Sequence, residues 1–475
     1  MSVSQRLTLA VLSAAALIDI LDGSIVTVAM PAIQRDLGFG AAGVTWTVNA
    51  YLIAFAGLLL LSGRIGDLVG RSRMFLAGNA VFTVASLLAG AAQNTTTLIA
   101  ARFAQGIGGA LTASVVLGIL VTRFPGERER ARALGVFSFT GAAGASIGQV
   151  LGGVLTDALN WHWIFLINVP IGVAVVVLGA RVLPADRGAG LAAGADLPGA
   201  VLVTGGLVLG SYTIVDIGRY GWVSAHTLGF GAISTVLLTG FVIRQATART
   251  PLLALRVFRS RKVSGAIVVQ MLTLSAMFAF QVVVALYMQR VLGYTALQTG
   301  LAMLPAAIGI GAVSLFASAP LSARFGTRNV LFGGLVLLLA GMTWLTRVPV
   351  HGHYVTDLLP MMVAIGGGGL VLPALAALGM SGASERDAGV ASGLFNTTQQ
   401  LGMALGVAVL STLAAARAEN LSAAGMSEAA ALTGGYRLAF LAAAVSLAAA
   451  LAVTAVVLRP ATPAEAVSEL PVPVN

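Results

Sequence analysis

Two carboxylates, Asp19 and Asp22, stand three residues apart in the first long apolar stretch of the chain. In a helix this spacing places both side chains on one face. Where the dielectric constant is low, two such carboxylates cannot both ionise cheaply. One of them is therefore expected to exchange protons near neutral pH. Arg102, a basic residue inside another apolar stretch, is expected to hold the other charged, and Gln105 lies one turn further along the same stretch.

The composition places these side chains in a membrane protein. The chain has 475 residues, of which 58% are hydrophobic and 9% are charged, whereas soluble domains carry about 25% charged residues. So few charges cannot cover a soluble fold, which excludes a soluble enzyme. The net charge of +10 does not indicate nucleic-acid binding, because basic residues flank membrane spans on the cytoplasmic side. The chain has no cysteine, so disulfides and cysteine-ligated metals are excluded, and no metal site or cofactor is expected.

Apolar segments long enough to cross a bilayer recur along the whole chain. A crossing needs about 20 mostly apolar residues in a helix, because every backbone polar group must be paired within the segment. By this criterion we predict fourteen spans in an all-α polytopic membrane protein. Their approximate bounds are 7–30, 45–62, 74–92, 97–121, 134–156, 163–183, 197–215, 227–243, 263–289, 298–318, 329–346, 355–379, 388–413 and 436–458.

The basic residues predict the orientation of these spans. With both termini in the cytoplasm, twenty of the 27 basic residues fall in cytoplasmic segments and six fall outside. Cytoplasmic loops are enriched in lysine and arginine. We therefore predict that both termini are cytoplasmic.

An internal repeat divides the chain into two similar halves. The sequence GRIGDLVGRSR at 63–73 follows the second span, and APLSARFGTRN at 319–329 follows the tenth, with a shared glycine and basic character. Each lies two spans into a six-span block if spans seven and eight are an insertion. We predict a six-helix bundle at 1–183, a linker with two additional spans at 184–262, a second six-helix bundle at 263–458 and a cytoplasmic tail at 459–475. Such halves are typical of transporters.

Five stretches in this order resemble the major facilitator superfamily. GRIGDLVGRSR is similar to its loop signature, and LDGSIVTVAMP at 21–31 to the first span of its drug:proton antiporters. RFAQGIGGA at 102–110 resembles its fourth-span motif. WHWIFLINVPIG at 161–172 and ASGLFNTTQQLGMALG at 391–406 are similar to hallmarks of the fourteen-span branch, the EmrB/QacA-type multidrug exporters. The resemblance covers essentially the whole chain and implies the major facilitator fold.

The resemblance also implies roles for particular residues. Asp22 belongs to the antiporter stretch and takes the main role, in proton exchange or in attracting a cationic passenger, while Asp19 is secondary. Arg102 and Gln105 are assigned to the same proton-coupling or substrate site as the two aspartates. The loop implies a conformational latch in which Asp67 pairs with an arginine or a helix start in one of two conformations. Its residues are Gly63, Asp67, Gly70, Arg71 and Arg73.

The fifth span departs from the family pattern. Its packing face comprises Gly144, Gly148 and Gly152, and Gln149 stands where the antiporter motif has proline. A proline would remove a helix hydrogen bond and bend the span, whereas glutamine would not. The export direction implied by the family is correspondingly less firmly fixed.

Polar and aromatic residues inside other spans are candidates for the lining of a passenger cavity. An amide can hydrogen-bond a passenger or join two helices, and for any one residue the second interpretation is favoured. The candidates are Asn49, Gln270, Phe278, Gln281, Asn396 and Gln399.

The leading hypothesis is a monomeric, proton-coupled exporter of amphipathic drugs or antibiotics in the bacterial cytoplasmic membrane. The chain has no Walker-type nucleotide signature, so the proton gradient is the expected energy source. An alternative is transport of one specific metabolite. A membrane sensor or an integral-membrane enzyme is disfavoured, because the sequence shows neither a large soluble appendage nor a clustered acid–base site.

Overall fold

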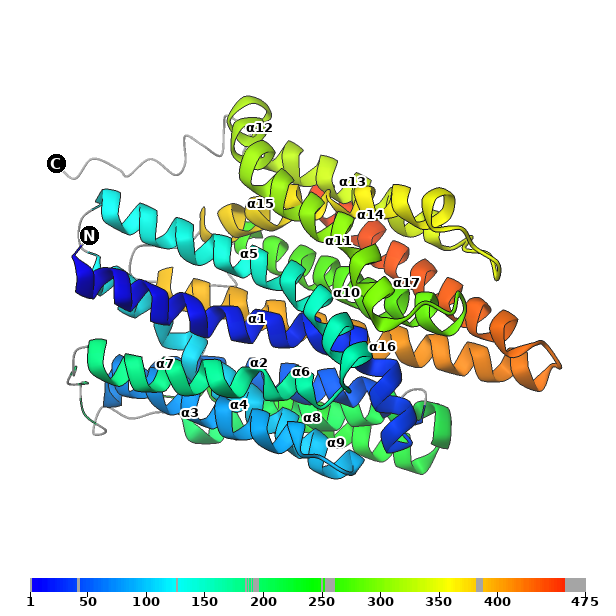
Figure 1. Cartoon of the computed structure of the whole chain (residues 1–475), viewed down its shortest axis with the longest axis horizontal. Helices are drawn as coiled ribbons and strands as arrows, with labels where there is room; N and C mark the ends of the chain where they lie inside the picture. The colour runs from blue at the N-terminus through cyan, green and yellow to red at the C-terminus, as the bar shows by residue number, and fades with distance from the viewer. Residues whose placement is uncertain are drawn as a thin grey trace.

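The computed structural model describes residues 2–40, 43–124, 127–183, 186, 188, 190, 196–248, 251–252, 261–381 and 388–457. These residues form helices joined by short turns, and no strand occurs among them. Figure 1 shows the helices lying roughly side by side along the long axis of the molecule. The long helices are expected from the apolar runs, because in a bilayer only a helix satisfies its own backbone polar groups.

The helices before the linker form a first group. Helix α1 begins at a capping box formed by Ser2 and Gln5 and ends at Gly38, whose positive φ of 68° closes the last turn. The elements of this group are α1 (Val3–Leu37), η1 (Gly43–Thr45), α2 (Trp46–Val69), α3 (Arg71–Gly90), α4 (Thr95–Arg123), α5 (Glu127–Ala158), α6 (Trp163–Leu166) and α7 (Asn168–Val182). In this group α1 packs on α5, and α4 packs on α2 and α3.

Two further helices form a hairpin that packs against the rest. Helices α8 (Leu197–Tyr220) and α9 (Ala225–Thr247) pair with each other, and α8 also contacts α2 and α16. Asp196, the N-cap of α8, ties the hairpin together by accepting hydrogen bonds from Arg244 Nε at 2.5 Å and Gln245 Nε2 at 2.9 Å. The predicted domain boundaries at 183/184 and 262/263 remain a prediction.

The remaining helices form a second group, to the upper right of the first in Figure 1. Helix α11 begins at a capping box formed by Thr295 and Gln298. The elements of this group are α10 (Arg261–Arg290), α11 (Ala296–Ala312), η4 (Val313–Ala317), α12 (Ser318–Phe325), α13 (Thr327–Leu345), η5 (Tyr354–Leu358), α14 (Leu359–Ile365), α15 (Gly368–Ser381), α16 (Ala388–Ala423) and α17 (Glu428–Val456).

The predicted count of fourteen spans is not confirmed. Each predicted segment overlaps helical residues. Among the described residues, however, twelve helices are long and apolar enough to cross a membrane, or thirteen if α2, bent by 53°, is one span. An all-helical protein with many spans is established, and fourteen remains a prediction.

The two loops that indicated a repeat share their backbone geometry. Gly70 ends α2 and begins α3 with a φ of 114°. Gly326 ends α12 and begins α13 with a φ of 83°. Residues with a Cβ rarely adopt these angles, so the shared glycine serves the same tight turn in both halves.

The same pairs of helices pack through glycines in both halves. Helix α5 lies against α1, and α16 lies against α10, each through two glycines four residues apart. A Cβ on any of the four would lie between 2.3 and 2.9 Å from a facing carbonyl oxygen. The glycines are Gly148, Gly152, Gly402 and Gly406, and the carbonyls belong to Leu21, Ile25, Met271 and Ser275. Close helix approach through small residues is a common way of packing in membranes.

Candidate coupling site

An ion pair between α1 and α4 lies at the centre of the candidate site. Arg102 Nη1 donates to Asp22 Oδ2. The two side chains are 1% and 0% exposed. An unpaired charge here would be costly, so each is the partner that the other requires. Arg102 is therefore held inside the protein.

Two amides complete the shell of Asp22. Its Oδ1 accepts hydrogen bonds from Gln105 Nε2 at 3.2 Å and from Asn168 Nδ2 at 3.0 Å. Gln105 also donates to Ser86 Oγ at 2.8 Å and accepts from Arg102 Nη1 at 2.9 Å through its Oε1. The carboxylate of Asp22 therefore accepts hydrogen bonds from three donors, on Arg102, Gln105 and Asn168.

The guanidinium of Arg102 is held from other sides as well. Its Nε donates to the backbone oxygen of Thr47 at 2.6 Å. The ring of Tyr51 lies 4.8 Å and that of Phe165 lies 5.6 Å from its Cζ, within range of cation–π attraction. The network thus joins α1, α2, α3, α4, α6 and α7, and its central groups are closed to solvent in this conformation.

Asp19 has a different environment from Asp22. It is half-buried, and no hydrogen bond or ion pair links it to another residue in the described part of the chain. Gly23 lies one turn further along the same face of α1. A Cβ added at Gly23 would meet no atom within 4 Å. Asp19 is therefore half-buried without a hydrogen-bond partner among the described residues, whereas Asp22 is sealed in a packed network.

The predicted latch loop makes two sets of contacts. Arg71 donates to Asp67 Oδ1 from Nη2 at 3.0 Å and from Nε at 3.1 Å, in an ion pair that is substantially exposed on both sides. The start of α3 is capped instead by Asp186, which accepts from the backbone N–H groups of Arg71 at 2.5 Å and Ser72 at 3.1 Å. A Cβ at Gly70 would lie 2.8 Å from the backbone oxygen of Asp186. Glycine at 70 thus allows residue 186 to approach.

The other loop and fifth-span residues lie as follows. Arg73 is exposed, and a Cβ at Gly63 would make ordinary contact with Ser114. Gly144 lies against Leu17 of α1 and extends the glycine face of α5. Gln149 is 5% exposed, and its Oε1 has no hydrogen-bond partner among the described residues.

The six candidates for a cavity lining are scattered over several environments. Asn49 is fully buried, and neither of its amide atoms has a partner in the described part of the chain, so it lines no open surface in this conformation. Gln270 accepts a hydrogen bond from Thr398 Oγ1 at 3.2 Å, which joins α10 to α16. Phe278, Gln281 and Gln399 are half-buried, and Asn396 is exposed.

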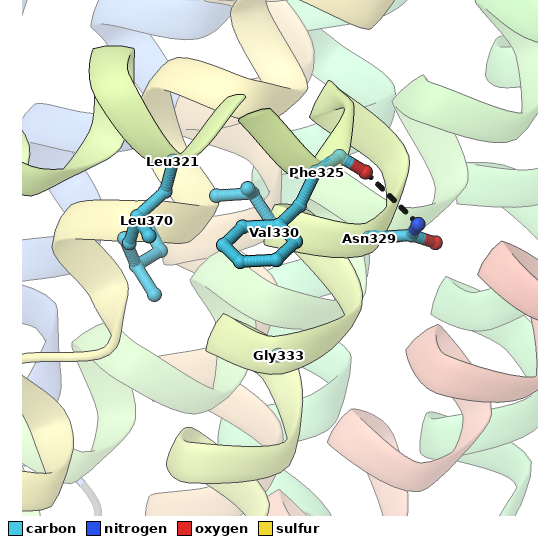
Figure 2. A pocket seen from close by; sticks show the side chains of 6 residues that line it. All are labelled: Leu321, Phe325, Asn329, Val330, Gly333 and Leu370. Atoms are coloured by element: carbon cyan, nitrogen blue, oxygen red, sulfur yellow. Dashed lines mark hydrogen bonds between the residues drawn. The ribbon is translucent and has the colours of Figure 1, made fainter. Parts of the chain in front are cut away.

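A groove of about 320 Å³ lies elsewhere, where α12 and α13 meet α15 (Figure 2). Its wall is apolar apart from Asn329, whose amide donates to the backbone oxygen of Phe325 at 2.9 Å. The groove contains no ionisable side chain and none of the predicted site residues. It is therefore no candidate for the coupling site.

Comparison with known proteins assigns the family. The sequence profile of the Major Facilitator Superfamily matches residues 12–407. The chain belongs to the major facilitator superfamily. It is 37% identical to the puromycin resistance protein pur8 of Streptomyces alboniger, over 91% of this chain and 87% of that protein. It is 39% identical to the cephamycin export protein CmcT of Amycolatopsis lactamdurans, over 83% and 82% of the two chains. These relatives fit the drug:proton antiporter branch.

The fold agrees with other members of the superfamily. The crystal structure of the nucleoside transporter NupG (D323A mutant) superposes with a TM-score of 0.68, over 95% of this chain and 100% of that one, at 12% identity. At that identity the likeness shows the fold alone. Relatives and structural neighbours are transporters and exporters rather than enzymes, so this chain is a membrane-embedded bacterial transport protein and not an enzyme.

Several site residues of this superfamily member were not singled out from the sequence, among them Asn168 and Asp186. Asn168 lies within WHWIFLINVPIG, and its buried amide could have been grouped with the other amides in spans. The same stretch places Trp161 Nε1 2.8 Å from Asp36 Oδ2 at the end of α1. The role of Asp186 could not be predicted, because nothing in the sequence around an aspartate in a linker indicates which distant helix it caps.

Proposed function

We propose that this chain exports amphipathic drugs or antibiotics across the bacterial cytoplasmic membrane by proton-coupled alternating access. Its relatives support the passenger class, since one is named for puromycin resistance and another for cephamycin export. In this proposal the chain is monomeric, crosses the membrane fourteen times in a six-two-six plan, and keeps both termini in the cytoplasm.

The unequal environments of Asp19 and Asp22 are the observation that carries the proposal. Asp22 accepts hydrogen bonds from three donors, one of which is Arg102. Asp19, three residues earlier, is half-buried and has no such partner among the described residues. We therefore assign proton exchange to Asp19. In this assignment Asp22 remains paired with Arg102. The main role thus passes from Asp22, which the sequence favoured, to the pair acting together.

The buried network supports a way to couple the proton to the conformation. Asp19 and Asp22 lie on the same helix, and Asp22 is bonded to groups on α4 and α7. A change of charge at Asp19 alters the field on a network that spans most of the first group of helices. One proton moved through 100 mV supplies about 2.3 kcal/mol, which is enough to bias a conformational equilibrium.

Transport of one specific metabolite is the second candidate. It is favoured by Gln149, which stands in the place of the antiporter proline and is buried against α11: a Cβ at Gly300 would lie 2.3 Å from its backbone oxygen. Glutamine keeps the backbone N–H that a proline would remove, so the proline bend of the family motif is not expected in α5.

Growth of a pump-deficient bacterium separates the two candidates. Expression of the wild-type chain should protect the cells against several dyes, biocides or antibiotics and lower their accumulation. Asp19→Asn should remove this protection at unchanged membrane abundance. Asp36→Asn, an aspartate at the far end of the same helix, should retain it. Protection against no compound, with accumulation unchanged, would support the metabolite transporter instead.

A further inference from the structure

A carboxylate from the first group of helices caps a helix of the second group. Asp157, in the last turn of α5, accepts hydrogen bonds from the backbone N–H groups of Ala296 at 3.3 Å and Leu297 at 2.8 Å. These are the first two residues of α11, and the N–H groups of a first helical turn have no acceptor within their helix. The N-cap Thr295 serves Gln298 and not these two. Asp157 therefore completes the cap of α11.

The backbones of α5 and α11 approach closely enough for this contact. A Cβ at Gly153 would lie 2.4 Å from the Cα of Leu297. One turn deeper, a Cβ at Gly300 would lie 2.3 Å from the backbone oxygen of Gln149. Because Gly153 and Gly300 have no side chain, α5 and α11 can approach closely, and this approach places the carboxylate of Asp157 at the start of α11.

Other contacts join the same two groups of helices at the same end. Gln289 Nε2, near the end of α10, donates to the backbone oxygen of Val28 at 2.8 Å. The guanidinium of Arg290 donates to Gln34 Oε1. Val28 and Gln34 belong to the second half of α1. The end of the molecule that the basic residues place outside is therefore closed by contacts between the two groups.

We propose that Asp157 is a gate residue, whose carboxylate holds α11 against α5 while the outer end is closed and leaves α11 when that end opens. The inference rests on the proposed alternating access and adds a residue to it. Asp157 suits this role because its carboxylate accepts from two N–H groups that point out of the start of α11. The contact is also partly open to water, so it can break when the helices separate. A charge at a helix start stabilises the closed arrangement without making it permanent.

The absence of cysteine from the chain makes a distance measurement simple. Spin labels are attached to Gln93→Cys, between α3 and α4, and to Ala424→Cys, between α16 and α17. Both residues are exposed at the outer end, one on each group of helices. Pulsed electron paramagnetic resonance in nanodiscs then reports how far apart these ends are, with no passenger or proton gradient required.

In the labelled wild-type background, Asp157→Ala should raise the ratio of long to short distances about two- to fivefold. Asp157→Asn keeps an acceptor oxygen without the charge and should give a smaller rise. Asp36→Asn is the matched control, because Asp36 bonds Trp161 within its own group of helices. It should leave the ratio unchanged.

Identical distance distributions in wild type, Asp157→Ala and Asp157→Asn would overturn the gate, and so would an equal shift in Asp36→Asn. Because the exposed Asp157 supports no buried group, monodisperse protein is expected for both variants. Failure of the export proposal is a separate result. It would appear as cells that gain no protection, whereas the distances would still respond to Asp157.

Discussion

Asp22 and Arg102 are 80 residues apart in the chain and form an ion pair that solvent does not reach. Each charge is acceptable inside the membrane because of the other and because of Gln105, Asn168 and the backbone of Thr47. A buried pair of this kind depends on its hydrogen bonds, since the loss of solvation is otherwise larger than the Coulomb attraction.

Removing one member of this pair should destabilise the protein strongly. Arg102→Ala leaves Asp22 buried without its countercharge, and we expect a loss of about 3–5 kcal/mol in unfolding free energy. Arg347→Ala, at an exposed arginine, should change it by less than about 0.5 kcal/mol. Unfolding in detergent, followed by circular dichroism, gives both values. Equal, small losses would show that the pair contributes little.

The exposed pair of Asp67 and Arg71 should affect rate rather than stability. An exposed i,i+4 pair contributes about 0.3–0.5 kcal/mol, so Asp67→Asn should fold and bind a passenger normally. If the loop is a latch, the variant should interconvert more slowly between inward and outward states. Transport rates are compared at equal amounts of protein. Wild-type rates in Asp67→Asn would rule out the latch.

The Asp196 cap should make the α8–α9 hairpin sensitive to acid. Burial alone would raise the pKa of Asp196, but hydrogen bonds from Arg244, Gln245 and Gly199 and the charge of Arg244 together lower it below its ordinary value of 3.8. The stabilisation is therefore complete above that value and is lost as the pH falls through the lower, folded-state pKa. Wild type should melt above Asp196→Asn at pH 7, and the difference should shrink as the pH falls below 3.8. A constant difference in melting temperature would contradict this.

Two helical glycines should respond oppositely to alanine. In Gly406→Ala the new Cβ would lie 2.3 Å from the backbone oxygen and 2.4 Å from the Cα of Ser275, so α16 must move away from α10. We expect a loss of about 1–3 kcal/mol. In Gly23→Ala the Cβ meets nothing within 4 Å, and the higher helix propensity of alanine should stabilise α1 by up to about 1 kcal/mol. Melting temperatures that fall equally would contradict the proposed packing.

The sequence predicted the helices, and a partner for Arg102 in the first span, for physical reasons that hold in any membrane protein. An apolar run must become a helix, and a charge such as Arg102 within one needs a partner, for which the sequence offered both carboxylates of the first span without choosing between them. Helix ends were predicted less well. Helix α1 has 35 residues, more than a bilayer requires, and hydrophobicity does not report turns that continue into water.

Contacts that depend on relative helix placement could not be predicted. The caps made by Asp157 and Asp186 each join a carboxylate to a backbone N–H, and any helix start offers the same group. The burial of Asp22 and partial exposure of Asp19 also depend on how α1 is rotated. The three-residue spacing of Asp19 and Asp22 places both on one face of α1, so it does not predict which of the two is buried.

The most direct test of the coupling site measures passenger transport into proteoliposomes driven by an imposed pH gradient, with a compound identified by the toxicity panel. Wild type and Asp36→Asn should transport it. Asp19→Asn should still bind the compound but lose gradient-driven transport, and Asp22→Asn should lose both transport and stability. Gradient-driven transport that survives in the Asp19→Asn, Asp22→Asn double variant would show that proton coupling lies elsewhere in the chain.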